Sequence, residues 1–498
     1  MANKGFLVGF DLGSSSVKVS IVAADTGILK SAGSSPEREM DINSPQAGWA
    51  EQDPENWWVH ARTAFQKAMK AGDVNAADVL AIGISYQMHG LVAVDKNKKV
   101  LRPSIIWCDS RAVEIGDRAF QALGEKFCLD HLLNSPGNFT ASKLKWVKEN
   151  EPYVFDAIDK IMLPGDYLAM RLTGEIATTV SGLSEGIFWD YQSKSVSKEL
   201  LKHYGLSESL IPNLVHTFGT QGVLSKDAAA ELGLRAGVPV CYRAGDQPNN
   251  AFSLNALNPG EVAATAGTSG VIYGVVDKPA SDSQSRVNPF VHVNHTNENQ
   301  RLGILLCVNG TGIMNSWLRK NLGDGVGYDR LNHLAASAPV GSDGLRVLPF
   351  GNGAERMLAN KNIGASFHKL DLNRHTQSHL SRGVQEGIVF ALGYGFEILN
   401  AMGLTPSVIR AGRENMFLSD TFCEAFANVT NARLELFNTD GAQGAARGAG
   451  IGAGIYSSMK EAFDGLKCIT DFNPDKTKQP AYNEAYIDWK HILNKQLV

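Results

Sequence analysis

Asp11 and the small residues that follow it form the first candidate site for chemistry. In residues 6–22, two apolar arms flank Asp11, Gly13 and three serines. Each arm suits a buried β-strand, and in the second arm apolar and polar residues alternate with a period of two. Gly13 allows a tight turn whose amide groups can face a phosphate, and Asp11 at its mouth is placed to hold a hydrated Mg²⁺. For this stretch alone, a plain β-hairpin with a polar turn is the alternative.

The same pattern returns in the other half of the chain. Residues 261–276 place Gly267, Thr268, Ser269 and Gly270 between two apolar arms. One glycine-rich turn by itself is weak evidence for a nucleotide site. Two such hairpins, one in each half, predict a duplicated domain with a nucleotide held between the copies.

Two polar segments follow predicted strands in the first half. Residues 79–85 are apolar enough for a buried strand, and Met88 and His89 come just after its carboxyl end. Residues 238–245 predict a short strand, with Asp246 at its carboxyl end and a helix expected next. Ligands of α/β sheets bind at such ends. The alternatives are a core methionine beside a histidine satisfied by the backbone, and an aspartate that caps the helix.

In their order along the chain, the two hairpins resemble the phosphate loops of the sugar-kinase, actin and Hsp70 superfamily. Residues 9–15 resemble the opening motif of its carbohydrate-kinase branch, the FGGY family, and the similarity extends from about residue 6 to about residue 456. It implies an α/β fold of two RNase-H-like domains with a cleft for ATP and Mg²⁺ between them. Residues 1–254 would carry the sugar site, the first phosphate loop and the catalytic aspartate. Residues 255–498 would carry the second phosphate loop and the adenosine site.

The resemblance assigns roles to the residues at the strand ends. Gly-Asp at 245–246 resembles the catalytic base of the family, so Asp246 is expected to contact the sugar and take its hydroxyl proton as the phosphoryl group leaves ATP. Met88 and His89 resemble the Met-His pair that contacts the sugar in the xylulokinase subgroup. A neutral imidazole can donate to one hydroxyl and accept from another. Asp11 is the expected Mg²⁺ ligand.

Asp109 and Arg111 follow a further strand that resembles this subgroup, although Cys108 replaces its usual asparagine. They are either a surface ion pair, which contributes little, or part of the sugar pocket, so Asp109 is a substrate-binding candidate. Residues 178–185 depart from the family pattern. Residues 409–419 lack its usual glycine run on the adenosine, which leaves the nucleotide preference open. The nucleotide contacts that the resemblance implies are Gly13, Ser14, Ser15, Lys18, Gly267, Thr268, Ser269, Gly312, Gly412 and Asn415.

Other segments are expected to position these residues. Asp53 suits the cap of a helix that has Pro54 at its first position and runs to about residue 70. Residues 139–147 resemble the family and are interpreted as packing and domain scaffold. Residues 384–396 predict a helix with small residues at its contacts, and the polar tail from about residue 470 is expected to be peripheral.

Length and composition fit a multidomain enzyme. A chain of 498 residues exceeds the usual size of one domain, about 50 to 250 residues. A net charge of −4 gives no reason to expect nucleic acid or an anionic membrane as a partner. No apolar run approaches the ~20 residues of a membrane span, and the first strand begins too early to leave room for a signal peptide. We therefore expect a cytoplasmic protein whose six scattered cysteines stay reduced.

These observations predict a carbohydrate kinase that uses ATP to phosphorylate a primary hydroxyl of a ketopentose, with D-xylulose giving its 5-phosphate as the first choice. Kinases for ribulose, xylitol or another polyol are the alternatives within this class. A sugar- and ATP-binding regulator without turnover, or an actin-like filament former, are the alternatives outside it. The presence of both Asp11 and Asp246 favours an enzyme. The expected partners are the sugar and ATP, without nucleic acid or membrane, and a homodimer is an open alternative to a monomer.

Overall fold

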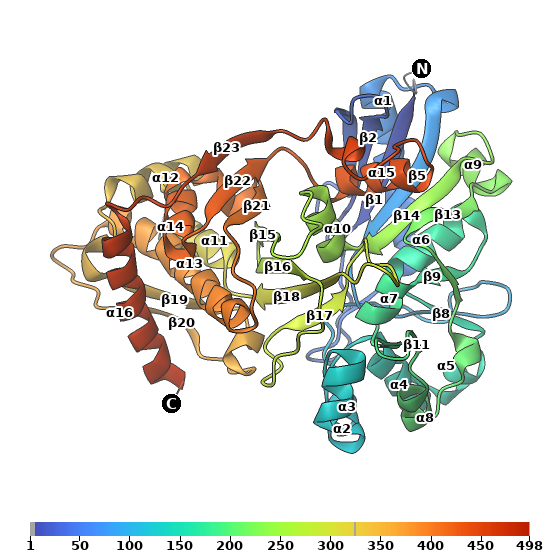
Figure 1. The fold of residues 1–498 in the computed structure, drawn as a ribbon, viewed down its shortest axis with the longest axis horizontal. Helices are drawn as coiled ribbons and strands as arrows, with labels where there is room; N and C mark the ends of the chain where they lie inside the picture. Colours follow the sequence, from blue (N-terminus) through green and yellow to red (C-terminus); the bar gives the residue numbers. More distant parts are fainter. Residues whose placement is uncertain (1–4, 323–324, 498) are drawn as a thin grey trace. The chain divides into compact units, whose positions relative to one another are not determined.

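The computed structural model describes residues 5–322 and 325–497 and divides into two compact units. Unit 1 comprises the chain up to Asn255, together with Phe290–Leu302 and Thr439–Leu466. Unit 2 comprises Ala256–Pro289, Gly303–Asn438 and the chain from Lys467 onward. Each unit is organised around one large sheet with helices packed on it (Figure 1).

Unit 1 is built on a six-stranded sheet of β1 (Phe6–Leu12), β2 (Val17–Ala23), β3 (Leu29–Ser35), β5 (Val79–Tyr86), β13 (Phe218–Val223) and β14 (Pro239–Gly245). Their order across the sheet is β13-β14-β5-β1-β2-β3. β1 is antiparallel to β2 but parallel to β5, and β5 is parallel to β14. The carboxyl ends of β1, β5 and β14 therefore lie at one edge of the sheet, and ligands of α/β folds bind at such an edge.

The second sheet has seven strands: β15 (Val262–Ala266), β16 (Gly270–Val276), β17 (Asn288–Val291), β18 (Leu302–Val308), β21 (Val408–Gly412), β22 (Arg433–Phe437) and β23 (Cys468–Phe472). Their order is β17-β18-β16-β15-β21-β22-β23. β15 is antiparallel to β16 and parallel to β21, which is parallel to β22. In both sheets the first strand of a hairpin is followed across the sheet by two parallel strands. This repetition confirms the predicted duplicated α/β fold.

Helices and small sheets complete the two units. Unit 1 contains α1 (Pro54–Gly72), α2 (Val113–Leu123), α3 (Glu125–Phe127), α4 (Thr140–Asn150), α5 (Pro152–Asp156), α6 (Pro164–Thr173), α7 (Val180–Glu185), α8 (Lys198–Tyr204), α9 (Lys226–Leu232), α10 (Asp246–Ser253) and α15 (Gly441–Gly452). Unit 2 contains α11 (Gly312–Asn321), α12 (Tyr328–Ser337), α13 (Gln377–Ala401), α14 (Asp420–Thr430) and α16 (Gln479–Leu497). The small sheets pair β4 (Glu51–Gln52) with β7 (Ser104–Ile105), β6 (Val92–Val94) with β8 (Lys160–Met162), β9 (Ala177–Thr179) with β12 (Asn213–Val215), β10 (Trp189–Asp190) with β11 (Ser195–Val196), and β19 (Arg346–Phe350) with β20 (Gly364–His368).

Helix α15 lies late in the chain but belongs to unit 1. Figure 1 shows it in orange-red beside the blue strands β1 and β5. A Cβ atom on Gly9 would lie 1.9 Å from the Ala442 oxygen, and one on Gly83 would lie 2.0 Å from the Ala445 oxygen. The helix backbone can therefore rest directly on the sheet only where the strands carry glycine. This packing makes Thr439–Leu466 part of unit 1. The domain boundary predicted between residues 254 and 255 had placed this segment in the second domain.

The local predictions for the first helix are confirmed. The Asp53 carboxylate accepts a hydrogen bond from the Glu55 amide at 3.0 Å, and Pro54 is the first residue of α1. A capping side chain of this kind satisfies one of the amide groups that a helix start leaves without a partner. The apolar residues of α1 then cover the first sheet, because Trp57, Ala61 and Phe65 are fully buried.

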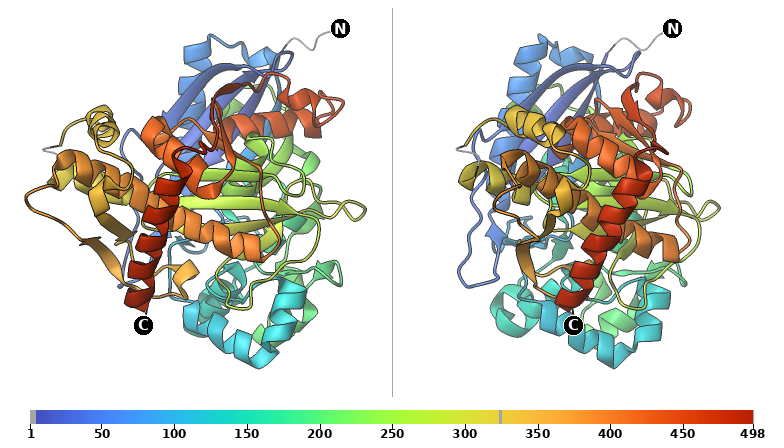
Figure 2. Two further views of the ribbon diagram at one scale, coloured as in Figure 1. Left: turned by 60° about the vertical axis from the view of Figure 1, so that its left-hand side comes forward. Right: turned by 90° about the vertical axis from the view of Figure 1, so that its left-hand side faces the viewer.

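The expectation of a peripheral C-terminal tail was wrong. Residues Cys468–Phe472 form β23 and pair with β22. In α16, drawn in red in Figure 2, an apolar side faces the unit 2 core: Trp489 is fully buried, and its Nε1 donates to the Val347 oxygen at 2.7 Å. Tyr482, Ala485, Trp489 and Leu493 recur at helical spacing within a polar sequence, so the mean composition concealed an amphipathic helix.

Among the residues that the structure describes, no helix is both long enough and apolar enough to cross a membrane.

Candidate active site

The turn after β5 places Met88 and His89 at the carboxyl edge of the first sheet. Met88 is 4% exposed, whereas the His89 side chain is only partly buried. The His89 backbone has a φ of +62°, in the left-handed region that non-glycine residues rarely occupy. Its ring lies edge-on to Phe139, with ring centroids 4.8 Å apart, and 5.3 Å from the ring of Phe290. The imidazole therefore has a defined position between two aromatic rings.

The protonation of the His89 ring follows from its backbone partner. The Nδ1 atom lies 2.9 Å from the carbonyl oxygen of Glu185. A carbonyl oxygen can only accept, so Nδ1 carries the proton and donates it to this bond. In the neutral ring, Nε2 is then the acceptor nitrogen. The expectation that the imidazole offers a donor and an acceptor to a sugar is narrowed to one acceptor.

Asp246 begins α10 directly after β14. The N-cap residue of this helix is Gly245, and Asp246 is the first helical residue, so it does not occupy the cap position that was the structural alternative. Burial, reinforced by the negative charge of Asp11, raises the pKa of Asp246 to about 7. A carboxyl group with a pKa near the working pH suits a general base, because it is ionised yet still basic enough to accept a proton.

Glu185 lies beside Met88 and Asp246, and it was not among the site residues predicted from the sequence. It is 1% exposed. A Cβ atom on Gly245 would lie 2.5 Å from Oε2 of Glu185 and 2.6 Å from Cγ of Met88, so the three residues meet beside Asp246. The only sequence signal was that residues 178–185 depart from the family pattern, which does not indicate burial.

The environment of Glu185 favours its neutral form. Burial raises its pKa well above the ordinary value, the Tyr86 hydroxyl opposes this effect, and the negative charges of Asp246 and Asp166 add to it. Among the described residues, no ion pair joins Glu185 to a basic side chain. A buried carboxylate without such a partner is unfavourable, so the group keeps its proton more readily than an exposed glutamate does.

The first predicted phosphate loop is the turn between β1 and β2. The Gly13 amide donates to the Ser16 oxygen at 3.0 Å, and Gln52 Nε2 donates to the Ser14 oxygen at 2.7 Å. Ser15 is exposed, and its carbonyl oxygen accepts from the Met40 amide at 2.8 Å. These contacts fix the backbone of the turn. Lys18, across the hairpin from Asp11, is exposed.

Asp11 lies against the start of α15. A Cβ atom on Gly441 would be 2.7 Å from Oδ2 of Asp11, so glycine is needed for this approach. Burial raises the pKa of Asp11. The described residues include no group of three or more His, Cys, Asp or Glu side chains arranged to hold a metal. Mg²⁺ commonly binds through one or two carboxylates with water and substrate phosphates, and Asp11 beside the turn fits that mode.

In unit 2, predicted nucleotide residues come together. The Gly312 amide donates to the Gly267 oxygen at 2.9 Å, and the Ile313 amide donates to the Thr268 oxygen at 3.1 Å. A Cβ atom on Gly267 would lie 3.8 Å from Nδ2 of Asn415. The β15–β16 turn, with Ser269 partly exposed, therefore packs on the start of α11 and beside Asn415. Gly412 ends β21 three residues before Asn415, on the strand next to β15.

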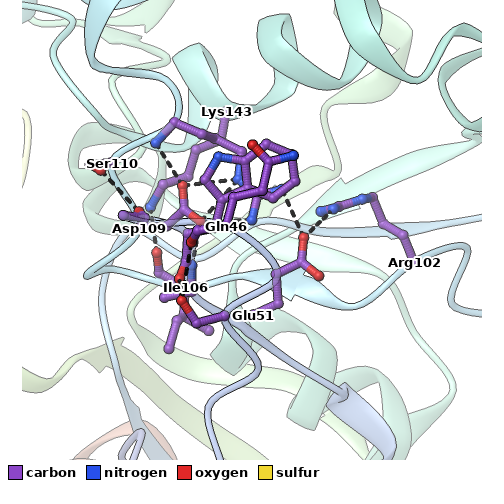
Figure 3. A network of polar contacts seen from close by, with 12 residues as sticks. Gln46, Glu51, Arg102, Ile106, Asp109, Ser110 and Lys143 are labelled. Carbon is purple, nitrogen blue, oxygen red and sulfur yellow. Dashed lines mark hydrogen bonds and ion pairs between the residues drawn. The ribbon is translucent and has the colours of Figure 1, made fainter.

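Asp109 and Arg111 form a buried pair rather than the surface ion pair that was one alternative. Their side chains are 0% and 1% exposed. Arg111 donates to both Asp109 oxygens, at 3.0 Å and 2.9 Å from Nε, and the Ala50 amide donates to Oδ2 at 2.6 Å. Figure 3 shows the Asp109 carboxylate inside this network. Its oxygens are engaged by the protein itself, so in this structure the carboxylate holds the loop together.

The network extends from Arg111 to neighbouring segments. Arg111 Nη1 forms an ion pair with Glu51 at 2.7 Å, and Arg102 reaches the same glutamate at 2.6 Å. The Arg111 guanidinium lies over the rings of Trp49 and Trp146, 3.8 Å and 4.8 Å from their centroids. Buried charges arranged in this way satisfy one another and join β4, β7 and α4.

Comparison with known proteins shows that the chain is similar to carbohydrate kinases. Residues 6–253 match the model of the N-terminal domain of the FGGY family of carbohydrate kinases. The chain is 31% identical to the xylulose kinase of Escherichia coli strain K12 over 98% of its own length and 99% of the relative. It is 29% identical to the xylulose kinase of Bacillus subtilis strain 168, over 98% and 96%. A crystal structure of xylulose kinase from Rhodospirillum rubrum superposes with a TM-score of 0.85 at 26% identity, covering 98% of each chain.

Proposed function

Because the chain belongs to the FGGY family of carbohydrate kinases, we propose that it transfers a phosphoryl group from ATP to a primary hydroxyl of D-xylulose, giving xylulose 5-phosphate. Similar proteins along its full length are xylulose kinases. A kinase for ribulose, xylitol or another polyol is the nearest alternative. A cytoplasmic location and a homodimer remain predictions.

The observation that carries this proposal is the position of Asp246. Asp246 is the first residue of α10, at the ligand-binding edge of the first sheet, and the pKa of its carboxyl group is raised to about 7. Met88 packs against the preceding Gly245, and His89 follows in the same turn. In the proposed reaction, Asp246 accepts the proton of the sugar hydroxyl as that oxygen bonds to phosphorus, and ADP leaves with the electron pair of the broken bond.

The sugar contacts are assigned to the residues beside this base. His89 offers Nε2 as an acceptor for one sugar hydroxyl, and Met88 supplies an apolar wall that selects for shape. Asp109 contributes by holding the loop after β7, because the protein itself engages its carboxylate oxygens.

ATP and Mg²⁺ are assigned to the two hairpin turns. Gly13, Ser14 and Ser15 would contact phosphate at the first turn, and Gly267, Thr268 and Ser269 would do so at the second, where Gly312, Gly412 and Asn415 are also assigned to the nucleotide. Asp11 would hold Mg²⁺, which when bound neutralises charge on the transferring phosphate. The exposed Lys18 adds positive potential at the first turn.

A substrate panel tests the proposal. Purified protein is incubated with Mg²⁺, ATP or GTP and one of D-xylulose, D-ribulose, xylitol or D-fructose, and nucleoside diphosphate release is followed. We expect the highest kcat/KM with D-xylulose. A higher kcat/KM with ribulose or a polyol would reassign the sugar, and sugar binding without diphosphate release would indicate a regulator.

A further inference from the structure

Lys143 is a buried lysine of α4 that the proposed reaction does not use. Its side chain is 0% exposed. Its Nζ donates one hydrogen bond to the His89 carbonyl oxygen at 2.9 Å and another to the Ile106 carbonyl oxygen at 2.9 Å. Figure 3 shows Lys143 with Ile106 and Asp109 around the same network. One amino group thus joins α4, the turn after β5 and the segment after β7.

The surroundings of Lys143 indicate that this position is unfavourable for a charge. Burial lowers its pKa to about 7; the charge of Asp109 and the Cys108 thiol favour the ammonium form, and Arg111 opposes it. Removing an amino group from water is unfavourable unless its hydrogen bonds are replaced. Here two backbone carbonyls replace them, so this lysine binds the backbone and not a carboxylate.

One of those carbonyls belongs to the residue whose backbone is strained. His89 has a φ of +62°, a conformation that raises the energy of a non-glycine residue and persists only where surrounding contacts hold it. The contacts act on both sides of the residue: Lys143 binds the His89 carbonyl, and the Glu185 carbonyl binds its ring. A change in the backbone of this turn would rotate the imidazole.

We propose that Lys143 is a positioning residue of the sugar site, which holds His89 in its left-handed conformation and thereby directs the imidazole toward the substrate. The inference rests on the proposed function in taking the ligand to be a sugar. The positioning itself is a property of the protein without ligand.

Replacement by methionine tests this role. Lys143→Met keeps the apolar stem but removes both hydrogen bonds to the backbone. We expect the KM for D-xylulose to rise about tenfold or more, since two carbonyls lose their donor, while the KM for ATP changes less than about twofold. Lys145→Met is the matched control, because Lys145 lies on the same helix and pairs with Glu149 at 3.1 Å near the surface. The control should keep both constants.

A double-mutant cycle separates positioning from general destabilisation. If Lys143 acts through His89, Lys143→Met should add little to the loss caused by His89→Ala, and the two effects should be clearly non-additive. Fully multiplicative losses in kcat/KM would overturn the proposal, as would an unchanged KM for the sugar in Lys143→Met.

Hydrogen exchange gives a readout that needs no substrate. In Lys143→Met, the amides of residues 88–91 should exchange several-fold faster than in the wild type, including the Leu91 amide bonded to the Ile105 oxygen. If the wild type does not phosphorylate xylulose, the proposed function fails while this comparison still decides the role of Lys143. Should Lys143→Met not fold, Lys143→Gln, which keeps a donor on a shorter side chain, should show the same faster exchange. Unchanged exchange in the folded variant would overturn the proposal.

Discussion

The carbonyl oxygen of Glu185 and Nδ1 of His89 lie 2.9 Å apart, and this contact sets the tautomer of the histidine. The same glutamate directs its carboxyl group to Gly245, next to the proposed base. One residue of α7 therefore links the sugar-contacting turn with the start of α10.

Replacement of the Glu185 carboxyl by an amide should be tolerated. Glu185→Gln has the shape and net charge of the protonated acid, so we expect kcat within about threefold of the wild type. The pKa that controls the rising part of the pH–rate profile should stay in place. A shift of that pKa to lower pH by about one unit would contradict the neutral form, because removing a nearby negative charge eases ionisation of Asp246.

The pH dependence of the reaction should follow Asp246. The base acts in its ionised form, and its pKa is raised to about 7. We therefore expect kcat/KM for the sugar to rise with pH and level off above about pH 7 to 8. Steady-state rates between pH 5.5 and 9, with protein stability checked at each pH, measure this. A profile already flat at pH 5.5 would mean that the pKa of the base is not raised.

The same raised pKa affects stability as well: the contribution of Asp246 to the stability of the fold should fall as the pH rises, whereas activity should rise. The ordinary pKa of an aspartate is about 4, so the native state holds the Asp246 proton more tightly than the unfolded state. The resulting stabilisation is complete below pH 4 and is lost as the pH rises through about 7. The stability of Asp246→Asn relative to the wild type should therefore be higher at pH 8 than at pH 4.5. Equal differences in Tm at the two pH values would argue against this linkage.

Much of the fold could be predicted because it depends on local pattern. The two hairpins, the buried strand before Met88 and the cap at Asp53 each follow from residue type and spacing within a few positions. The packing of α15 on the first sheet could not be predicted, because it depends on Gly9 and Gly83, which lie more than 350 residues earlier in the chain. The amphipathic side of α16 was concealed by its polar average.

The candidate site was predictable only in part. Asp246, Met88 and His89 follow strands, so their arrival at one sheet edge follows from topology. Lys143 lies in a segment interpreted as scaffold and Glu185 in one that departs from the family pattern, and charged residues are ordinarily exposed. Their burial is a tertiary property. Asp109 was selected for the sugar pocket, but its carboxylate is engaged by Arg111 and the Ala50 amide.

The close packing of α15 on the first sheet should make Gly83 intolerant of a side chain. A Cβ atom there would lie 2.0 Å from the Ala445 oxygen. We expect Gly83→Ala to lower the free energy of unfolding by about 1 to 3 kcal/mol, as overpacking of a core does. Gly327→Ala, whose Cβ atom would meet no atom within 4 Å, is the control. Urea denaturation of both variants measures the difference, and equal stabilities would contradict the packing described for α15.

Sugar recognition should depend on His89 more than nucleotide recognition does. Loss of one hydrogen bond to a buried hydroxyl is worth about 1 to 3 kcal/mol, so His89→Ala should lower kcat/KM for D-xylulose by roughly 5- to 150-fold. The KM for ATP should change little. Met88→Ala should instead narrow the difference between good and poor sugars. Unchanged xylulose kinetics in His89→Ala would remove the main support for the sugar assignment.

The turnover of Asp246→Asn tests the central claim most directly. The amide keeps the size of the carboxyl group and can still accept a hydrogen bond from the sugar, but it cannot take up the proton. We expect kcat to fall by about 10²- to 10⁴-fold, while calorimetry detects sugar binding close to that of the wild type. Turnover near the wild-type rate in the purified variant would contradict the assignment of Asp246 as the base.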